Sequence, residues 1–159
     1  MKLPHADARG KARMVDVGGK PAAKRRAVAQ ATLRAPAKVL RAVRENTLAK
    51  GDALAAAKLA GLMAAKRTAS LIPLCHPIAF SFADITFRFN RSRIVIESVI
   101  EGKARTGFEM EALVGAAVAA LTLYDMAKGL DKGMAVEEIA LLEKIGGRSG
   151  TYRKRRRRK

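Results

Sequence analysis

The most chemically distinctive stretch of the sequence is the apolar run that ends in Cys75 and His76. Residues 71–77 hold the only cysteine, one of the two histidines and two of the five prolines. Because proline is excluded from helix interiors and central strands, the run predicts a rigid loop that presents a thiol and an imidazole. The alternative is a buried turn in which Cys75 is a small apolar side chain.

Two further clusters combine acidic and basic groups. Asp125 and Lys128 are three residues apart, so a helix would place them on one face, where a partly apolar setting shifts proton affinities in a way that suits acid–base chemistry. Lys50 precedes Gly51 and Asp52 at the expected start of a helix, where free N–H groups attract anions. The alternatives are a surface ion pair of little energetic value and an ordinary helix cap.

A pair of carboxylates, Glu109 and Glu111, opens the longest proline-free helical pattern. One carboxylate could cap the helix while the other accepts a proton, although glutamate is common in first turns for electrostatic reasons alone. Metal-ligand pairs at the usual spacing are missing from the sequence, as are a Walker A motif and a G-x-G-x-x-G motif. We therefore expect no metal site and no resident cofactor.

The elements that must position these groups follow from the hydrophobic periodicity. It predicts strands over residues 14–17, 27–34, 80–89, 93–100 and 136–143, and helices from residue 36, over residues 53–68 and over residues 108–130. Thr106 and Glu109 fit a capping box before the last helix. The order predicts an α+β, ferredoxin-like antiparallel sheet with helices packed on one face. The other face would need a cover, from the N-terminal elements or another subunit.

The composition bounds the class of protein. The 159 residues predict one catalytic domain over residues 1–151, with a core of Ala, Leu, Val and Ile, and a basic, disordered tail over residues 152–159. No apolar run approaches the ~20 residues of a membrane span, and the start lacks the apolar core of a signal peptide. A single cysteine favours a reducing compartment, so we expect a cytoplasmic protein.

The charge balance is strongly basic. The formal net charge is +18, and residues 153–159 are all basic. Such an excess favours polyanionic partners, such as nucleic acid or a nucleoside polyphosphate, over neutral ones. A small basic nucleic-acid-binding protein without catalysis is therefore an alternative function, although few aromatic residues weigh against base stacking.

Taken together, the motifs resemble the MoaC family, the cyclic pyranopterin monophosphate synthases of molybdenum cofactor biosynthesis. The resemblance covers residues 10–151 and is carried by residues 14–17, 50–52, 64–68, 71–77, 106–113, 119–126 and 141–147, in family order and spacing. Leu-Cys-His-Pro and Glu-Met-Glu-Ala-Leu at this separation form a far more specific signal than any single cluster.

The resemblance implies a ferredoxin-like subunit in a homo-hexamer of three dimers, with active sites at subunit interfaces. It implies a lyase without a redox cofactor. The substrate would be a nucleoside-triphosphate derivative, GTP already cyclised between ribose and base in a dihydro form, which the family rearranges into cyclic pyranopterin monophosphate with release of diphosphate.

The resemblance also assigns roles to individual residues. It implies catalytic roles for Asp125, Lys128 and Lys50. It implies substrate contacts for Leu74, Cys75, His76, Glu109, Met110, Glu111, Lys144 and Arg25. The basic tail lies outside the family pattern, so we expect it to bind nucleic acid at most non-specifically.

Overall fold

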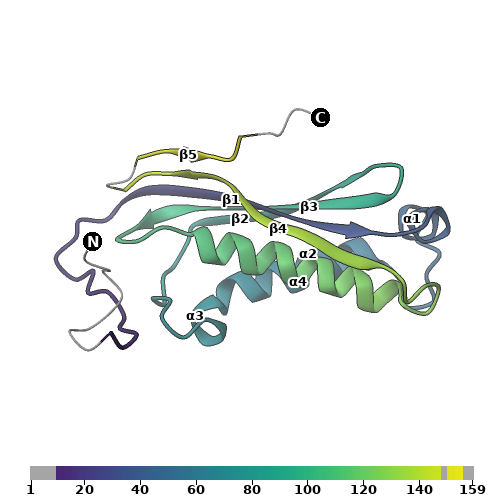
Figure 1. Cartoon of the computed structure of the whole chain (residues 1–159), viewed down its shortest axis with the longest axis horizontal. Coiled ribbons are helices and arrows are strands. Elements are labelled where there is room, and N and C mark those ends of the chain that lie inside the picture. The colour runs from purple at the N-terminus through teal and green to yellow at the C-terminus, as the bar shows by residue number, and fades with distance from the viewer. Residues whose placement is uncertain (1–9, 148–149, 156–159) are drawn as a thin grey trace.

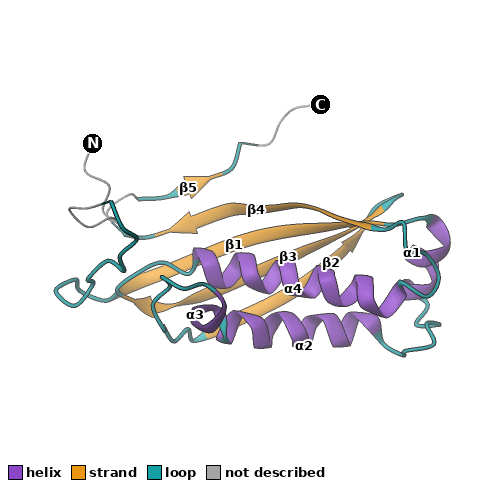
Figure 2. Cartoon of the chain, turned by 60° about the horizontal axis from the view of Figure 1, so that its bottom comes forward, coloured by secondary structure: helices purple, strands orange, loops and turns teal. Residues whose placement is uncertain are grey.

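The fold is an antiparallel sheet with two long helices on one face (Figures 1 and 2). The computed structural model describes residues 10–147 and 150–155. The elements in chain order are β1 (Ala23–Arg34), α1 (Ala37–Arg44), α2 (Ala53–Lys66), α3 (Thr68–Leu71), β2 (Phe82–Phe89), β3 (Arg93–Ala104), α4 (Glu109–Ala127), β4 (Ala135–Ile145) and β5 (Tyr152–Arg153). The sheet order is β2-β3-β1-β4-β5, and all paired strands are antiparallel. The predicted α+β, ferredoxin-like class is confirmed.

Alternation along the strands divides the two faces of the sheet. On β3, Ile94, Ile96 and Ile100 are fully buried towards the helices, as period-two patterning requires. The opposite face carries ion pairs, in which Arg26 bridges Glu101 and Glu143 on the two neighbouring strands. The helical face is therefore the core, and a cover for the charged face remains a prediction.

Small residues let α2 and α4 pack closely beneath the sheet. A Cβ atom on Gly61 of α2 would lie 2.8 Å from the carbonyl oxygen of Gly115 on α4. Among the described residues, α4 alone is long and apolar enough to cross a membrane. It packs on α2 and β1, and its inner face is fully buried from Ala112 to Leu123, so it is the central core helix.

Two local predictions are wrong. Residues 14–17 form an irregular segment without strand pairing. The capping box is also absent, because α4 begins at Glu109, so that Phe108 occupies the N-cap position without a side-chain cap hydrogen bond. Thr106 lies too far upstream of this start to cap the helix, and Glu109 takes the first position of the helix instead of the third.

The start of the tail also differs from the disorder expected from residue 152. Tyr152 pairs with Lys144 and Arg153 pairs with Glu143, which adds β5 to the edge of β4 (Figure 1). The N–H of Lys154 donates to the carbonyl oxygen of Leu142 at 2.8 Å, which continues the ladder. The exposed edge of a sheet offers unpaired backbone groups to any nearby segment, and charge patterning does not reveal this. Residues 156–159 lie outside the described residues.

Candidate active site

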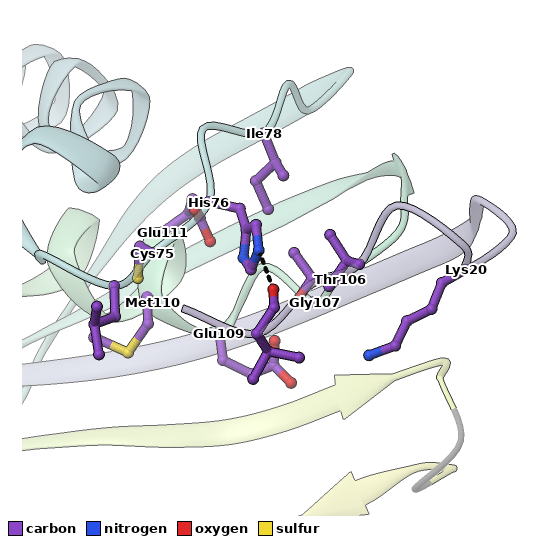
Figure 3. A pocket seen from close by; sticks show the side chains of 12 residues that line it. Lys20, Cys75, His76, Ile78, Thr106, Gly107, Glu109, Met110 and Glu111 are labelled. Carbon is purple, nitrogen blue, oxygen red and sulfur yellow. Dashed lines mark hydrogen bonds between the residues drawn. The ribbon is translucent and has the colours of Figure 1, made fainter. Parts of the chain in front are cut away.

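The pocket that contains Cys75 and His76, which we call the main pocket, lies where the loop after α3 meets the start of α4, and the segment before β1 borders it (Figure 3). Its volume is about 510 Å³. The lining residues are Val15, Val17, Lys20, Leu74, Cys75, His76, Ile78, Thr106, Gly107, Glu109, Met110 and Glu111. The two motifs that the sequence analysis treated as separate clusters therefore share one cavity.

The imidazole of His76 is fixed by the main chain. Its Nε2 atom lies 2.7 Å from the carbonyl oxygen of Val15, drawn as the dashed line in Figure 3. Because a carbonyl only accepts, Nε2 carries the hydrogen, and in the neutral ring the lone pair is on Nδ1. This bond also holds the N-terminal segment against the loop.

Two groups in the pocket have a raised pKa. Burial raises the pKa of Glu111 to about 7, and the negative charge of Glu109 adds to the effect. Glu111 is only 4% exposed to solvent. Burial, and then the charge of Glu111, raise the pKa of the Cys75 thiol. Glu111 is thus positioned to exchange a proton near neutral pH, whereas Cys75 stays a thiol and a poor nucleophile.

A second cluster lies at the other end of α4. Lys50 Nζ lies 2.7 Å from Asp125 Oδ2 and 3.0 Å from the Asp125 carbonyl oxygen, and Lys128 Nζ lies 2.7 Å from Asp125 Oδ1. Hydrogen bonds from Lys128 and then Lys50 lower the pKa of Asp125 to about 2, while Asp125 raises the pKa of Lys128. We call these three residues the ion triad. At neutral pH it holds one carboxylate and two ammonium groups.

The ion triad and the main pocket are far apart in one chain. Glu111 and Asp125 are fourteen residues apart on α4. At about 1.5 Å per residue, this separates them by about 21 Å along the helix axis. A single chain therefore does not bring the expected catalytic residues to the expected substrate-contacting residues.

A second concavity adjoins the main pocket at Glu109, which lines both. Its volume is about 540 Å³, and it is lined by Glu109, Ala140, Leu141, Lys144, Thr151, Tyr152 and Lys154. Lys144 Nζ donates to the carbonyl oxygen of Gly146 at 3.2 Å. The expected active-site lysine thus lies beside the main pocket, on the side of β4 and β5.

Arg25 is outside the lining of both cavities; it binds the main chain at the end of β3 and lies against the loop after β4. Its Nε donates to the carbonyl oxygen of Ala104 at 3.3 Å, and Nη2 donates to that of Arg105 at 3.2 Å. Gly147, with φ of +82°, lies against the guanidinium so closely that a Cβ atom would clash with Nη1. In this structure Arg25 is mainly a partner of the main chain, and its expected contact with phosphate remains a prediction.

Sequence reasoning did not single out several groups that line the cavities. Lys20 adds a cation to the main pocket, on the far side of the drawn group from Cys75 and Met110 (Figure 3). Tyr152 and Lys154 were read only as part of a basic tail. Their positions depend on tertiary pairing, so only the resemblance of the neighbouring motifs could have drawn attention to them. Within the described residues, no three His, Cys, Asp or Glu side chains are grouped to hold a metal ion.

The site therefore combines a carboxyl group whose pKa is raised to about 7, a fixed imidazole and several lysines around two cavities that share Glu109 as a lining residue. This arrangement suits proton transfer on an anionic small molecule. The fold and the site are those of an α+β enzyme, in which the candidate site residues lie at the two ends of the core helix α4.

Comparison with known proteins identifies the family of this chain. The model of the MoaC family matches residues 14–147. A cyclic pyranopterin monophosphate synthase of Thermomicrobium roseum is 52% identical over 96% of this chain and 93% of its own length. Proteins of the same name are 50% identical in Novosphingobium aromaticivorans, over 95% and 96%, and 48% identical in a Thermoanaerobacter species, over 96% and 98%. The chain belongs to the MoaC family.

Proposed function

We propose that this chain acts as a cyclic pyranopterin monophosphate synthase, a lyase of molybdenum cofactor biosynthesis. The observation that carries the proposal is the near-complete coverage of relatives of that name at about half identity. The substrate is the 3′,8-cyclised dihydro derivative of GTP, and the products are cyclic pyranopterin monophosphate and diphosphate. Residues that suit both proton transfer and anion binding line the cavities, as this reaction requires.

The protonation states suggest a division of labour among the proposed site residues. Glu111 exchanges protons with the purine-derived base, since its pKa is raised to about 7. Lys50 and Lys128, held by Asp125, present ammonium groups that stabilise the negative charge developing during phosphate cyclisation and diphosphate release. Leu74, Cys75, His76 and Met110 shape the pocket around the ring system.

The direct test is incubation of the purified protein with the cyclised dihydro-GTP intermediate, followed by detection of the pterin product and diphosphate. We expect turnover by the wild type and a loss of at least about a hundredfold in Asp125→Asn and Lys128→Ala. Lys103→Ala, which removes an exposed positive charge elsewhere, is the matched control. Near-normal rates in either triad variant would contradict the proposed catalytic roles.

We further propose that the active enzyme is a homo-oligomer, a hexamer in the arrangement typical of the family, whose site is completed across copies. The distance of about 21 Å between Glu111 and Asp125 along α4 supports this, because one compact substrate cannot meet both on one chain. Large apolar side chains also remain exposed on the helices, at 62% for Leu59, 51% for Met63 and 56% for Leu121.

Mixing two variants of strongly reduced activity tests the shared site. Glu111→Gln chains mixed with Asp125→Asn chains, after dissociation and reassembly, would form some sites with both wild-type residues if each site draws on two copies. We expect activity to return to about a quarter of the wild-type level under random assembly. Mixtures as inactive as the separate variants would show that both residues act within one chain, and light scattering would give the oligomer size.

The basic tail and the location of the protein are secondary proposals. We infer a cytoplasmic enzyme, consistent with a single cysteine of half-buried character. Residues 153–159 would bind nucleic acid only non-specifically through charge. Removing residues 156–159, which leaves β5 and Lys154 in place, should weaken salt-sensitive retention on a single-stranded DNA column without abolishing turnover, and retention unchanged by truncation would place polyanion binding elsewhere. This proposal replaces the alternative of a nucleic-acid-binding protein without catalysis.

A further inference from the structure

The C-terminal strand places side chains of alternating direction beside the candidate active site. Arg153 points to the charged face of the sheet, where its Nε lies 2.9 Å from Glu143 Oε2. Its neighbours Tyr152 and Lys154 must then point to the helical face, because successive side chains on a strand alternate. Both line the second concavity together with Lys144, the residue paired with Tyr152.

The main chain fixes this arrangement. The Lys154 N–H donates to the carbonyl oxygen of Leu142 at 2.8 Å, which sets the strand in register beyond Arg153. Lys154 Nζ lies 3.2 Å from Glu138 Oε1. Glu138 has φ of +51° at an irregularity of β4, which turns this carboxylate out of the regular ladder. Lys154 is thus held at the rim of the concavity by an exposed ion pair that an anionic ligand could replace.

We propose that β5 is part of the substrate site, with Lys154 and Lys144 forming a compartment that holds the phosphate chain. The inference rests on the proposed function and extends it to residues outside the matched family region, which ends at residue 147. Glu109 lines both this concavity and the main pocket, so the proposal places the ring system of the ligand beside Glu111 and its phosphates beside the two lysines. Tyr152 forms the side wall of the compartment.

The chemistry of the lining favours phosphates over the neutral ring. Lys144 and Lys154 carry ammonium groups, and Lys20 adds a third cation at the edge of the main pocket. Ammonium groups bind phosphate oxygens by short, charge-assisted hydrogen bonds. Diphosphate, the leaving product, has the same recognition chemistry as the end of the triphosphate, so it is the probe for this compartment.

The test compares Lys154→Ala with two charge-matched controls in the full chain. Arg153→Gln removes a cation from the same strand on its opposite face, and Lys103→Ala removes one distant from β5. We expect Lys154→Ala to raise KM and the inhibition constant of inorganic diphosphate about tenfold, with kcat changed less than threefold, as for loss of one charge-assisted hydrogen bond to substrate. Lys154→Arg should restore most of the affinity.

A second variant tests the same contact by an expected gain in affinity for diphosphate. Glu138→Gln removes the competing carboxylate, so it should lower the inhibition constant of diphosphate a few-fold. If Lys154→Ala and Lys103→Ala changed KM and the inhibition constant of diphosphate equally in an active enzyme, the inference would be overturned. The effect would then come from the net charge of the protein and not from a contact of Lys154 with phosphate. A wild type without turnover would overturn the proposed function itself, which distinguishes the two failures.

Discussion

Replacing Glu111 by glutamine should make the protein more stable at alkaline pH and remove a pH dependence that the wild type shows. Glu111 is only 4% exposed and its pKa is raised from 4.5 to about 7 by burial. Between these values the folded chain keeps a proton that the unfolded chain has released. The stability gained from that proton is fully present below pH 4.5 and is lost as the pH rises through 7.

The magnitude follows from the size of the pKa shift. Each pKa unit corresponds to about 1.36 kcal/mol, so the whole shift is about 3 kcal/mol, of which about 2.5 kcal/mol falls between pH 5 and pH 8.5. Glutamine fills the same volume and carries no charge at either pH. The difference in unfolding free energy between Glu111→Gln and the wild type should therefore grow by about 2.5 kcal/mol from pH 5 to pH 8.5, in favour of the variant.

Urea denaturation at both pH values provides the measurement. Because a homo-oligomer makes stability depend on concentration, protomer concentration and ionic strength are held fixed. Glu45→Gln, at the exposed C-cap of α1, is the control, and its difference from the wild type should not change with pH. A Glu111→Gln difference that is the same at pH 5 and pH 8.5 would refute a buried carboxyl group with a pKa near 7.

Three shorter predictions concern activity and packing. The profile of kcat/KM against pH should show a limb near pH 7 that disappears in Glu111→Gln, whereas Asp125, with its pKa lowered to about 2, should give no limb above pH 4. Ser98→Ala should raise the unfolding free energy by about 1 kcal/mol in thermal or urea denaturation, because the Ser98 hydroxyl is buried without a hydrogen-bond partner among the described residues. Gly61→Ala should lower it by about 1–2 kcal/mol, since the new methyl group would clash with Gly115 and Ile85 by more than the gain in helix propensity offsets.

Local patterns predicted most of the fold. Apolar, β-prone runs located β1, β2, β3 and β4, and the predicted cap of α2 is present, since Asp52 Oδ1 accepts from the Ala55 N–H at 3.0 Å. The predicted strand at residues 14–17 failed because two apolar residues of β propensity do not provide a partner strand. β5 was missed for the converse reason, since a short segment at the start of a basic tail pairs with a free sheet edge.

The site was predictable only where its groups are neighbours in sequence. The three-residue spacing correctly predicted that Asp125 and Lys128 share a helix face, and their side chains meet at 2.7 Å. Lys50 reaches the same carboxylate from 75 residues away, and only the family resemblance linked it to them. The burial of Glu111 was not visible either, because a glutamate in a first helical turn reads as an ordinary dipole partner until tertiary packing covers it.

The two ends of α4 differ in a way that orders the proposed chemistry. At its start, Glu111 can give or take a proton near neutral pH at little cost. At its end, Asp125 would have to give up its hydrogen bonds to two lysines before it could accept a proton. Its pKa of about 2 makes that protonation unfavourable near neutral pH. If both ends meet one substrate across copies of the chain, proton transfer to the base belongs to Glu111, and charge stabilisation belongs to Lys50 and Lys128. The role of Asp125 is then to hold two ammonium groups within reach of one substrate, where their mutual repulsion would otherwise separate them.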